Sequence, residues 1–390
     1  MPLRRLALRL RHLVFGTGAM LAACGGDLPI AERIASTRVL AIRNEVITPL
    51  YPDPGPDLGV RCEALPFEQV RLTPWVVTPE GPLDLTGPDF DPIYIACALG
   101  PGQGLFACLK AAVPTTLADI PECPVPSFAD LDPMAMGLPD PPSPCILPAD
   151  DSDDGAQDFT VPFASALLIG GDLEVTMISQ ISRSPGSPDT EACAAALLGN
   201  QSDLPNECLY AVQRVPVGPI ERLLLLAAEF GVDLPPELGA PPDPAAVPDG
   251  DRNPRILDFS VTLVRDGEST DLGPKNRGDV VQARLGDVLK IATNAPPTDL
   301  QEFLVPVNGG AGGTEIQAES YDGSWYRSWG TLQAGGSDDP LSENEWRMEM
   351  GTQDEDLSPP DGRATLFYVL RDGRVGLDWW WISVEVEPAS

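Results

Sequence analysis

Apolar and polar positions alternate most clearly in the last third of the chain. Leu257, Phe259, Val261 and Leu263 are separated by polar residues, as expected for a strand with one buried face. Further strands are predicted between turn residues at 279–284, 288–293, 301–307, 325–329, 364–370 and 380–386, with turns at 309–313 and 372–373. About seven short strands joined by turns predict an immunoglobulin-like (Ig-like) β-sandwich over residues 255–388.

The preceding part of the chain has a weaker β pattern and contains some helix. Strands are predicted at 38–46, 69–77, 92–99, 157–163 and 173–179, although the last segment could equally be helical. Because proline has no backbone N–H to donate, Pro74 predicts that this end of its strand lies at a sheet edge or in a β-bulge. Helices are predicted at 191–198 and 219–230, the second ending before Gly231. We therefore expect another Ig-like sandwich over residues 36–231.

Proline is concentrated in two segments of irregular pattern. Residues 112–148 combine proline with small residues and show no regular period, which indicates an insertion in the first domain. Residues 232–254 are rich in proline, glycine and aspartate and are predicted to link the domains. With 44 prolines, 37 glycines and no βαβ alternation, the chain is expected to be mostly β, with two Ig-like domains in tandem.

The N-terminus has the pattern of a secretion signal, in which four arginines precede a short apolar stretch. Leu21-Ala22-Ala23-Cys24 resembles the bacterial lipobox. The resemblance implies removal of residues 1–23, attachment of diacylglycerol and a further acyl chain such as palmitate to Cys24, and a tether over residues 24–35. The alternative is an ordinary secretory signal with an incidental cysteine. Gly25, not aspartate, follows the cysteine, which favours the outer membrane over retention in the inner membrane.

Charge and histidine content exclude several classes of function. The chain has 58 acidic and 25 basic residues and a formal net charge of −33, which disfavours nucleic acid and anionic lipid surfaces as partners. The single histidine, His12, lies in the predicted signal peptide. A mature chain without imidazole excludes Ser-His-Asp and Cys-His hydrolases and histidine-ligated zinc sites.

Seven cysteines follow Cys24, all between residues 62 and 208. Export to an oxidising compartment favours disulfides, and no CxxC spacing indicates a metal or redox site. A short loop favours the pair Cys193–Cys208, and a glycine-rich turn favours Cys97–Cys108. Cys123–Cys145 is the third pair expected, although the sequence alone does not fix the connectivity. Cys62 then remains unpaired. It is expected to be a small buried residue in a strand, the alternatives being a reactive thiol or a bond between molecules.

Three segments carry a resemblance to a known group of proteins: Arg38-Val-Leu-Ala-Ile-Arg43, the run from Glu63 to Pro74, and Leu370-Arg-Asp-Gly-Arg-Val-Gly-Leu-Asp-Trp379. They resemble uncharacterised surface lipoproteins of high-GC, gliding Gram-negative bacteria that look like tandem Ig-like domains and have no assigned catalytic residues. The resemblance covers both ends of the mature chain and omits the cysteine-rich middle. Val375 stands where that pattern has a second glycine.

Two tryptophans of the last strand share its more polar face. Trp380, Ile382 and Val384 form the apolar face, which leaves Trp379 and Trp381 on the side of the strand's glutamates. Exposed aromatic residues beside carboxylates can stack on sugar rings, so these two tryptophans are a candidate binding platform. The alternative is that they pack beneath the domain interface or a neighbouring loop.

Two acidic segments have some features of calcium sites. In the run that begins at Asp150, the oxygen ligands would come from Asp150, Ser152 and Asp154, with Gly155 at the turn, but Val161 stands where an EF-hand needs glutamate. In the linker, Asp249, Asp251 and Asn253 form a second oxygen cluster that could stiffen the domain junction. A solvated acidic surface is the alternative in both cases, and no cofactor is otherwise expected.

Together these features predict a lipoprotein anchored in the outer membrane, with Ig-like domains in a non-catalytic binding or structural role. Its partners would be the membrane, through the lipid, and an unidentified protein or glycan. The alternative is a surface protein that binds carbohydrate or cleaves glycosides with paired carboxylates. Such cleavage needs a deep cleft with two carboxylates about 5 to 10 Å apart.

Overall fold

The computed structural model describes residues 31–51, 59–87, 89–100, 102–113, 115–126, 140–149, 154–168, 171–181, 189–199, 207–229, 243, 249–306, 314–337, 339, 342–351 and 358–387. Cys24 and the whole predicted signal peptide lie outside these residues. The same holds for Asp150, Ser152, the predicted turn at 309–313 and most of the predicted linker.

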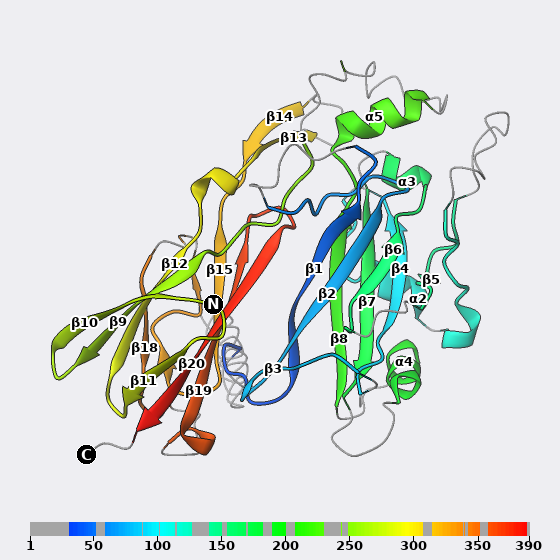
Figure 1. Ribbon diagram of the computed structural model, residues 1–390. Helices are drawn as coiled ribbons and strands as arrows, with labels where there is room; N and C mark the ends of the chain where they lie inside the picture. Colours follow the sequence, from blue (N-terminus) through cyan, green and yellow to red (C-terminus); the bar gives the residue numbers. More distant parts are fainter. Residues whose placement is uncertain are drawn as a thin grey trace, which may run out of the picture.

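The first half of the chain folds into a sandwich of two four-stranded sheets (Figure 1). One sheet has the order β1-β2-β3, with β6 also paired to β2, and the other has the order β5-β4-β7-β8. The strands are β1 (Arg38–Thr48), β2 (Gln69–Thr78), β3 (Gly81–Pro82), β4 (Ile93–Leu99), β5 (Cys145–Ile146), β6 (Gln157–Thr160), β7 (Asp172–Gln180) and β8 (Cys208–Pro216). The helices are α2 (Ala107–Ala112), α3 (Ser165–Leu168), α4 (Thr190–Leu198) and α5 (Ile220–Glu229), with a 3₁₀ turn at Leu117–Asp119.

Three disulfides connect two helices and the proline-rich insertion to the strands of the first sandwich. The cysteine pairs are those predicted from the sequence. Cys97–Cys108 joins β4 to α2, Cys123–Cys145 closes the insertion onto β5, and Cys193–Cys208 joins α4 to β8. A small apolar core of its own surrounds two of these pairs beneath α2 and α4. The prediction of a disulfide-stapled first domain with some helix is confirmed.

The second half of the chain forms a sandwich of two five-stranded sheets and a separate hairpin (Figure 1). The sheets have the orders β10-β9-β12-β18-β16 and β11-β20-β19-β15-β17, and β11 runs parallel to β20. The strands are β9 (Asp258–Arg265), β10 (Glu268–Lys275), β11 (Val280–Arg284), β12 (Val288–Asn294), β15 (Asp322–Arg327), β16 (Thr331–Leu332), β17 (Gly336–Ser337), β18 (Asn344–Arg347), β19 (Arg363–Arg371) and β20 (Leu377–Glu387). The hairpin pairs β13 (Glu302–Pro306) with β14 (Thr314–Ala318), and 3₁₀ turns lie at Pro297–Asp299 and Pro360–Gly362.

The predicted fold class, mostly β with two Ig-like sandwiches in tandem, is confirmed. Residues 173–179, for which strand and helix were both open, are part of strand β7. Strands β8, β10, β14 and β18 were not predicted, and neither were the two-residue strands β3, β5, β16 and β17. The most instructive of them is β10, whose residues are exposed or half-buried and lack apolar alternation, because β10 is an edge strand that pairs only with β9.

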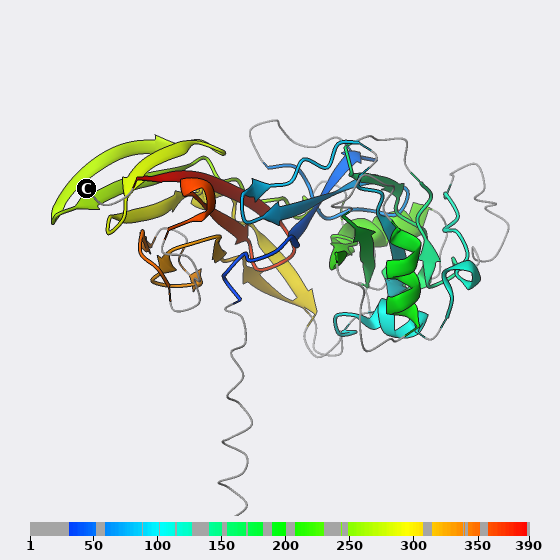
Figure 2. The same ribbon diagram turned by 90° about the horizontal axis from the view of Figure 1, so that it is seen from below.

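The two sandwiches lie side by side and share a buried interface (Figures 1 and 2). Strands β19 and β20 are buried on both faces over most of their length. One face, which includes Tyr368 and Trp380, belongs to the core of the second sandwich. The other face packs Phe367 and Trp379 against Trp75 of β2. The sheet that contains β19 and β20 therefore forms the second sandwich's side of the domain interface.

The predicted tether and linker both end inside this interface. Ile34 is fully buried, and its amide donates to the carbonyl of Arg327 in β15 at 2.8 Å. At the end of the predicted linker, Asp251, Arg252 and Asn253 are buried, and Arg252 forms a β-bridge with Arg61. The described ends of these two segments are therefore packed structure and not solvated connections.

Candidate functional site: a buried acidic cluster at the domain junction

Trp379, half of the predicted aromatic platform, is covered by the first sandwich. Its ring stacks on Trp75 with centroids 5.4 Å apart and planes inclined by 7°. The guanidinium of Arg43, from β1 of the first sandwich, lies over the Trp379 ring, 4.8 Å from its centroid. Trp379 is only 6% exposed, and Trp381 is half-buried. Trp379 is therefore not an exposed sugar platform. It packs in the domain interface, which was the alternative that the sequence left open.

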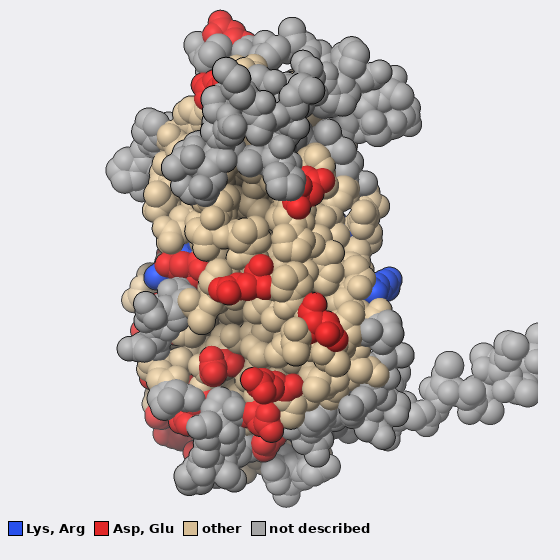
Figure 3. All heavy atoms as spheres, turned by 90° about the vertical axis from the view of Figure 1, so that its right-hand side faces the viewer, with Lys and Arg blue, Asp and Glu red and all other residues tan. Residues whose placement is uncertain are grey.

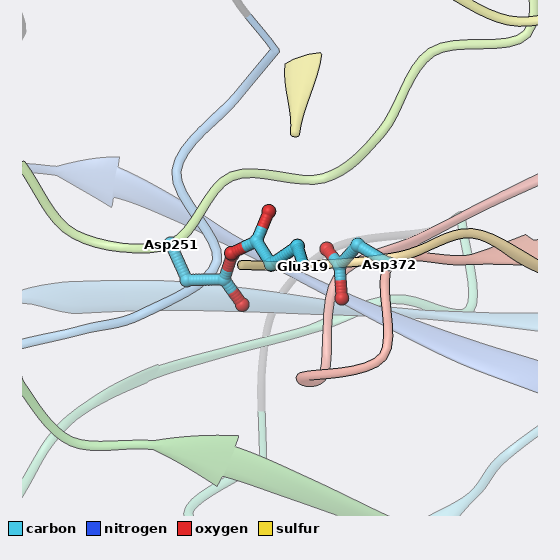
Figure 4. A group of neighbouring side chains, drawn as sticks. All are labelled: Asp251, Glu319 and Asp372. Atoms are coloured by element: carbon cyan, nitrogen blue, oxygen red, sulfur yellow. The ribbon is translucent and has the colours of Figure 1, made fainter. Parts of the chain in front are cut away.

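Elsewhere in the same junction, three carboxylates from distant parts of the chain meet. Asp251 comes from the linker, Glu319 from the loop between β14 and β15, and Asp372 from the turn between β19 and β20. One oxygen of each side chain lies within 4.8 Å of one oxygen of the others, and all three residues are buried. Figure 4 shows that the three side chains point toward one another. We call these three residues the acidic cluster.

Arg374 is the guanidinium that faces the acidic cluster. Its Nη2 lies 2.9 Å from Oε2 of Glu63, a buried carboxylate of the first sandwich. Its Nη1 lies 3.4 Å from Oε1 of Glu319 and 3.6 Å from Oδ1 of Asp251. Both contacts with the acidic cluster are therefore longer than the contact with Glu63. Arg374 therefore pairs most closely with Glu63 and leaves most of the cluster's charge unmatched.

Backbone amides hold each carboxylate of the acidic cluster in place. Oδ1 of Asp251 accepts from the amide of Arg252, Oε2 of Glu319 from Gln301, and Oδ1 of Asp372 from Arg374, at 2.8 to 2.9 Å. A side chain at Gly376 would overlap with Oδ2 of Asp372, so glycine is required there. Local hydrogen bonds thus fix one oxygen of each carboxylate and leave the other to face the cluster.

Burial without sufficient counter-charge changes the acidity of these groups. Burial, followed by the charge of Asp251, raises the pKa of Glu319 to about 7 and that of Asp372 to about 8. Burial also raises the pKa of Glu63, although Arg374 opposes this. Burial disfavours the charge of Arg374, but the carboxylates of Glu63 and Asp251 outweigh it and raise the pKa of the guanidinium. Arg374 is therefore a fixed positive charge in the junction.

Cys62 lies beside the acidic cluster and has no disulfide partner, as predicted. It is fully buried, and its amide donates to the carbonyl of Asp251 at 2.8 Å. Cys62 lies outside the strands, next to the bridge formed by Arg61, and not within a strand as expected. Burial, then the charges of Asp251 and Asp372, raises the pKa of its thiol well above the usual range. This environment disfavours the reactive thiolate.

The structure separates the residues of the predicted calcium set in the linker, and of the ligands predicted in the other segment it describes only Asp154. Asp249 pairs with Arg222 at 3.2 Å, and Asn253 bonds to the carbonyl of Asn44 and the amide of Leu377, so of the linker set only Asp251 reaches the acidic cluster. In the other segment, Asp154 lies 3.7 Å from Arg71. The predicted linker triad is therefore not a chelating set.

Sequence reasoning missed Glu319 and Asp372 because nothing in their local sequence relates either residue to Asp251. The available signal was indirect. Asp372 directly follows a buried nine-residue strand and is followed by Gly376, whose missing side chain makes room for the carboxylate. Only the fold brings these residues to Asp251.

A groove of about 890 Å³ lies elsewhere along the interface, beside Ile34 and Trp329. Its acidic side chains, Glu80, Asp361, Glu385 and Glu387, are all exposed to solvent. Glycoside hydrolysis needs a general acid whose pKa is raised by a desolvated setting. The exposed carboxylates of this groove do not have that setting.

No protein family and no curated protein matches this sequence. Among solved structures, dimeric latent PorU from Porphyromonas gingivalis aligns with 10% sequence identity and a TM-score of 0.18, over 92% of this chain and 35% of that one. This chain thus spans about a third of that protein's length, and the similarity is too low to support an argument. Within the described residues, no helix is both long enough and apolar enough to cross a membrane.

Proposed function

We propose that this chain is a lipoprotein anchored through Cys24 in the outer membrane, with a non-catalytic binding or structural role at the cell envelope. The observation that carries the proposal is the buried junction, which joins two Ig-like sandwiches into one body around the stack of Trp75 on Trp379. Ile34 is buried only ten residues after Cys24, so a lipid on Cys24 would hold this body close to the membrane. Such an arrangement suits the presentation of a surface at the cell envelope.

Three disulfides support export to an oxidising compartment. Each has its two cysteines in neighbouring elements of the first sandwich, and together they fasten the parts that add least to its main core. Disulfides of this density are typical of secreted and envelope proteins and are rare in the cytosol.

The chemistry of the described acids favours binding over catalysis. The buried acids lie inside the domain junction, and the groove's acids are exposed. Figure 3 shows acidic side chains scattered over the outer face of the first sandwich, with Lys and Arg only near its margins. A partner of that face would be neutral or basic, because a negative surface repels anionic ligands.

Metabolic labelling with palmitate, followed by membrane fractionation, tests the anchor. The wild-type chain should incorporate label and sediment with the outer membrane, whereas Cys24→Ala should lose the label. Ser36→Ala, an exposed substitution beyond the signal, is the matched control and should behave as wild type. A processed wild-type chain that is soluble and unlabelled would overturn the proposal.

A further inference from the structure

We propose that Asp251, Glu319 and Asp372 bind one calcium ion at the domain junction. The ligand set contains only carboxylate oxygens, which hard divalent cations prefer. The site is distinct from the lipid anchor and does not depend on it.

The spacing of the ligand oxygens fits one hard divalent cation, because the three oxygens lie within 4.8 Å of one another. Two oxygens on opposite sides of Ca²⁺ are about 4.6 to 5.2 Å apart, so Ca²⁺ can be held by oxygens anywhere within that limit. We assign calcium because it accepts irregular coordination, whereas magnesium needs near-ideal octahedral geometry, which carboxylates from three separate segments do not readily supply.

Two unsatisfied oxygens are the independent sign of a missing ligand. Asp251 is 0% and Asp372 is 1% exposed, and Oδ2 of each accepts no hydrogen bond from the described part of the chain. Both side chains point into the cluster (Figure 4). A buried carboxylate oxygen without a partner is costly, and direct coordination of a cation removes that cost.

The charges of the junction also call for a cation. Four buried carboxylates, those of the acidic cluster and Glu63, lie around the guanidinium of Arg374, which forms ion pairs with three of them. Buried charges are normally paired or coordinated to metals. One divalent ion beside Arg374 would bring the local charge close to balance.

Binding would fasten three separate segments. The carbonyl of Asp251 accepts from the amides of Cys62 and Glu63 in the first sandwich, while Glu319 and Asp372 belong to two loops of the second. An ion held by all three residues would therefore stabilise the contact between the sandwiches.

Equilibrium dialysis of the purified, EDTA-treated full chain against calcium chloride tests the proposal. We expect one bound calcium per chain and a rise in Tm of about 5 °C at a hundredfold excess over Kd. Magnesium chloride at the same concentrations should give a smaller rise. An equal response to magnesium would overturn the assignment to calcium.

Two variants keep the test specific. Asp372→Asn and Glu319→Gln preserve side-chain size and should weaken calcium binding by about tenfold or more. Asp322→Asn, the same substitution at an exposed position of the second sandwich, is the matched control and should bind as wild type.

Because both variants remove charge from a crowded acidic site, they should fold without calcium at least as well as the wild type. A wild-type chain that binds no calcium overturns the proposal, as does equal binding by Asp372→Asn. If a variant fails to fold, dialysis of the wild type still decides.

Discussion

The two parts of the domain junction are stabilised by different physics. The aromatic part, built on Trp75, Phe367 and Trp379, is stabilised by the packing of apolar side chains. The acidic cluster contains more negative charge than Arg374 can match. Burial of aromatic surface stabilises the junction under almost any solution condition, whereas buried carboxylates stabilise it only when protons or cations compensate them. The same interface therefore combines a permanent contact with a conditional one.

The largest expected effect is on the aromatic part. Trp379→Ala should lower the free energy of unfolding by about 4 kcal/mol, because it removes the ring that stacks on Trp75 and leaves a cavity. Urea denaturation followed by circular dichroism measures the change. The loss should be the same with calcium and with EDTA. A loss that calcium reverses would contradict the division of the junction into two independent parts.

A somewhat smaller effect is expected at the guanidinium. Arg374→Met should lower the free energy of unfolding by about 3 kcal/mol in EDTA, because Glu63 and the acidic cluster lose their positive partner. Calcium should restore part of this loss, unlike the loss in Trp379→Ala. The same urea titration with and without calcium makes the comparison, and a loss unaffected by calcium would show that the cluster holds no ion.

Asp287 in the second sandwich is a carboxylate that is paired with an arginine, and it provides a comparison for the acidic cluster. Burial alone would raise the pKa of Asp287, but its bonds to Arg265 and to the amide of Arg284 outweigh burial and lower it. The stability from this pair is therefore fully present above the unfolded pKa of about 3.9 and is lost as pH falls through the native pKa. The Tm of the wild type should fall more steeply than that of Asp287→Asn as the pH falls below about 4. Parallel curves would contradict the pairing.

The smallest expected effect is an absence of reaction at Cys62. Since the thiol is buried and its pKa is raised, iodoacetamide at pH 8 should modify it only after unfolding in urea. Intact-mass spectrometry measures the modification. Calcium should further slow any labelling that occurs through local opening, because the backbone amide of Cys62 donates a hydrogen bond to the carbonyl of Asp251. Rapid labelling of the native chain would show that the acidic side of the junction is open to solvent.

Sequence patterns predicted the features that depend on neighbours along the chain. A short loop identified the disulfide Cys193–Cys208. Alternation of apolar and polar residues identified strand β9 and the buried face of β20. Edge strand β10 was not predicted, because it is a strand through its pairing with β9 and not through its composition. The unpredicted strand β8 is mostly half-buried and shows no clean period of two.

The acidic cluster could be predicted only in part. Asp251 was a candidate because aspartate and asparagine recur around it in the linker, but its actual partners lie in two loops of the second sandwich. Whether an aspartate is a surface charge or a buried ligand depends on packing across domains. No local pattern at Asp372 or Glu319 contains that information.

Hydrogen exchange measured by mass spectrometry, with calcium and with EDTA, tests the central claim most directly. Calcium should slow exchange in peptides that contain residues 249–253, 319–321 and 372–376, and leave residues 366–370 beside Trp75 unchanged. Asp372→Asn should show no such difference. Equal exchange of the wild-type chain under both conditions would contradict the account, because the acidic part of the junction would then be as permanent as the aromatic part.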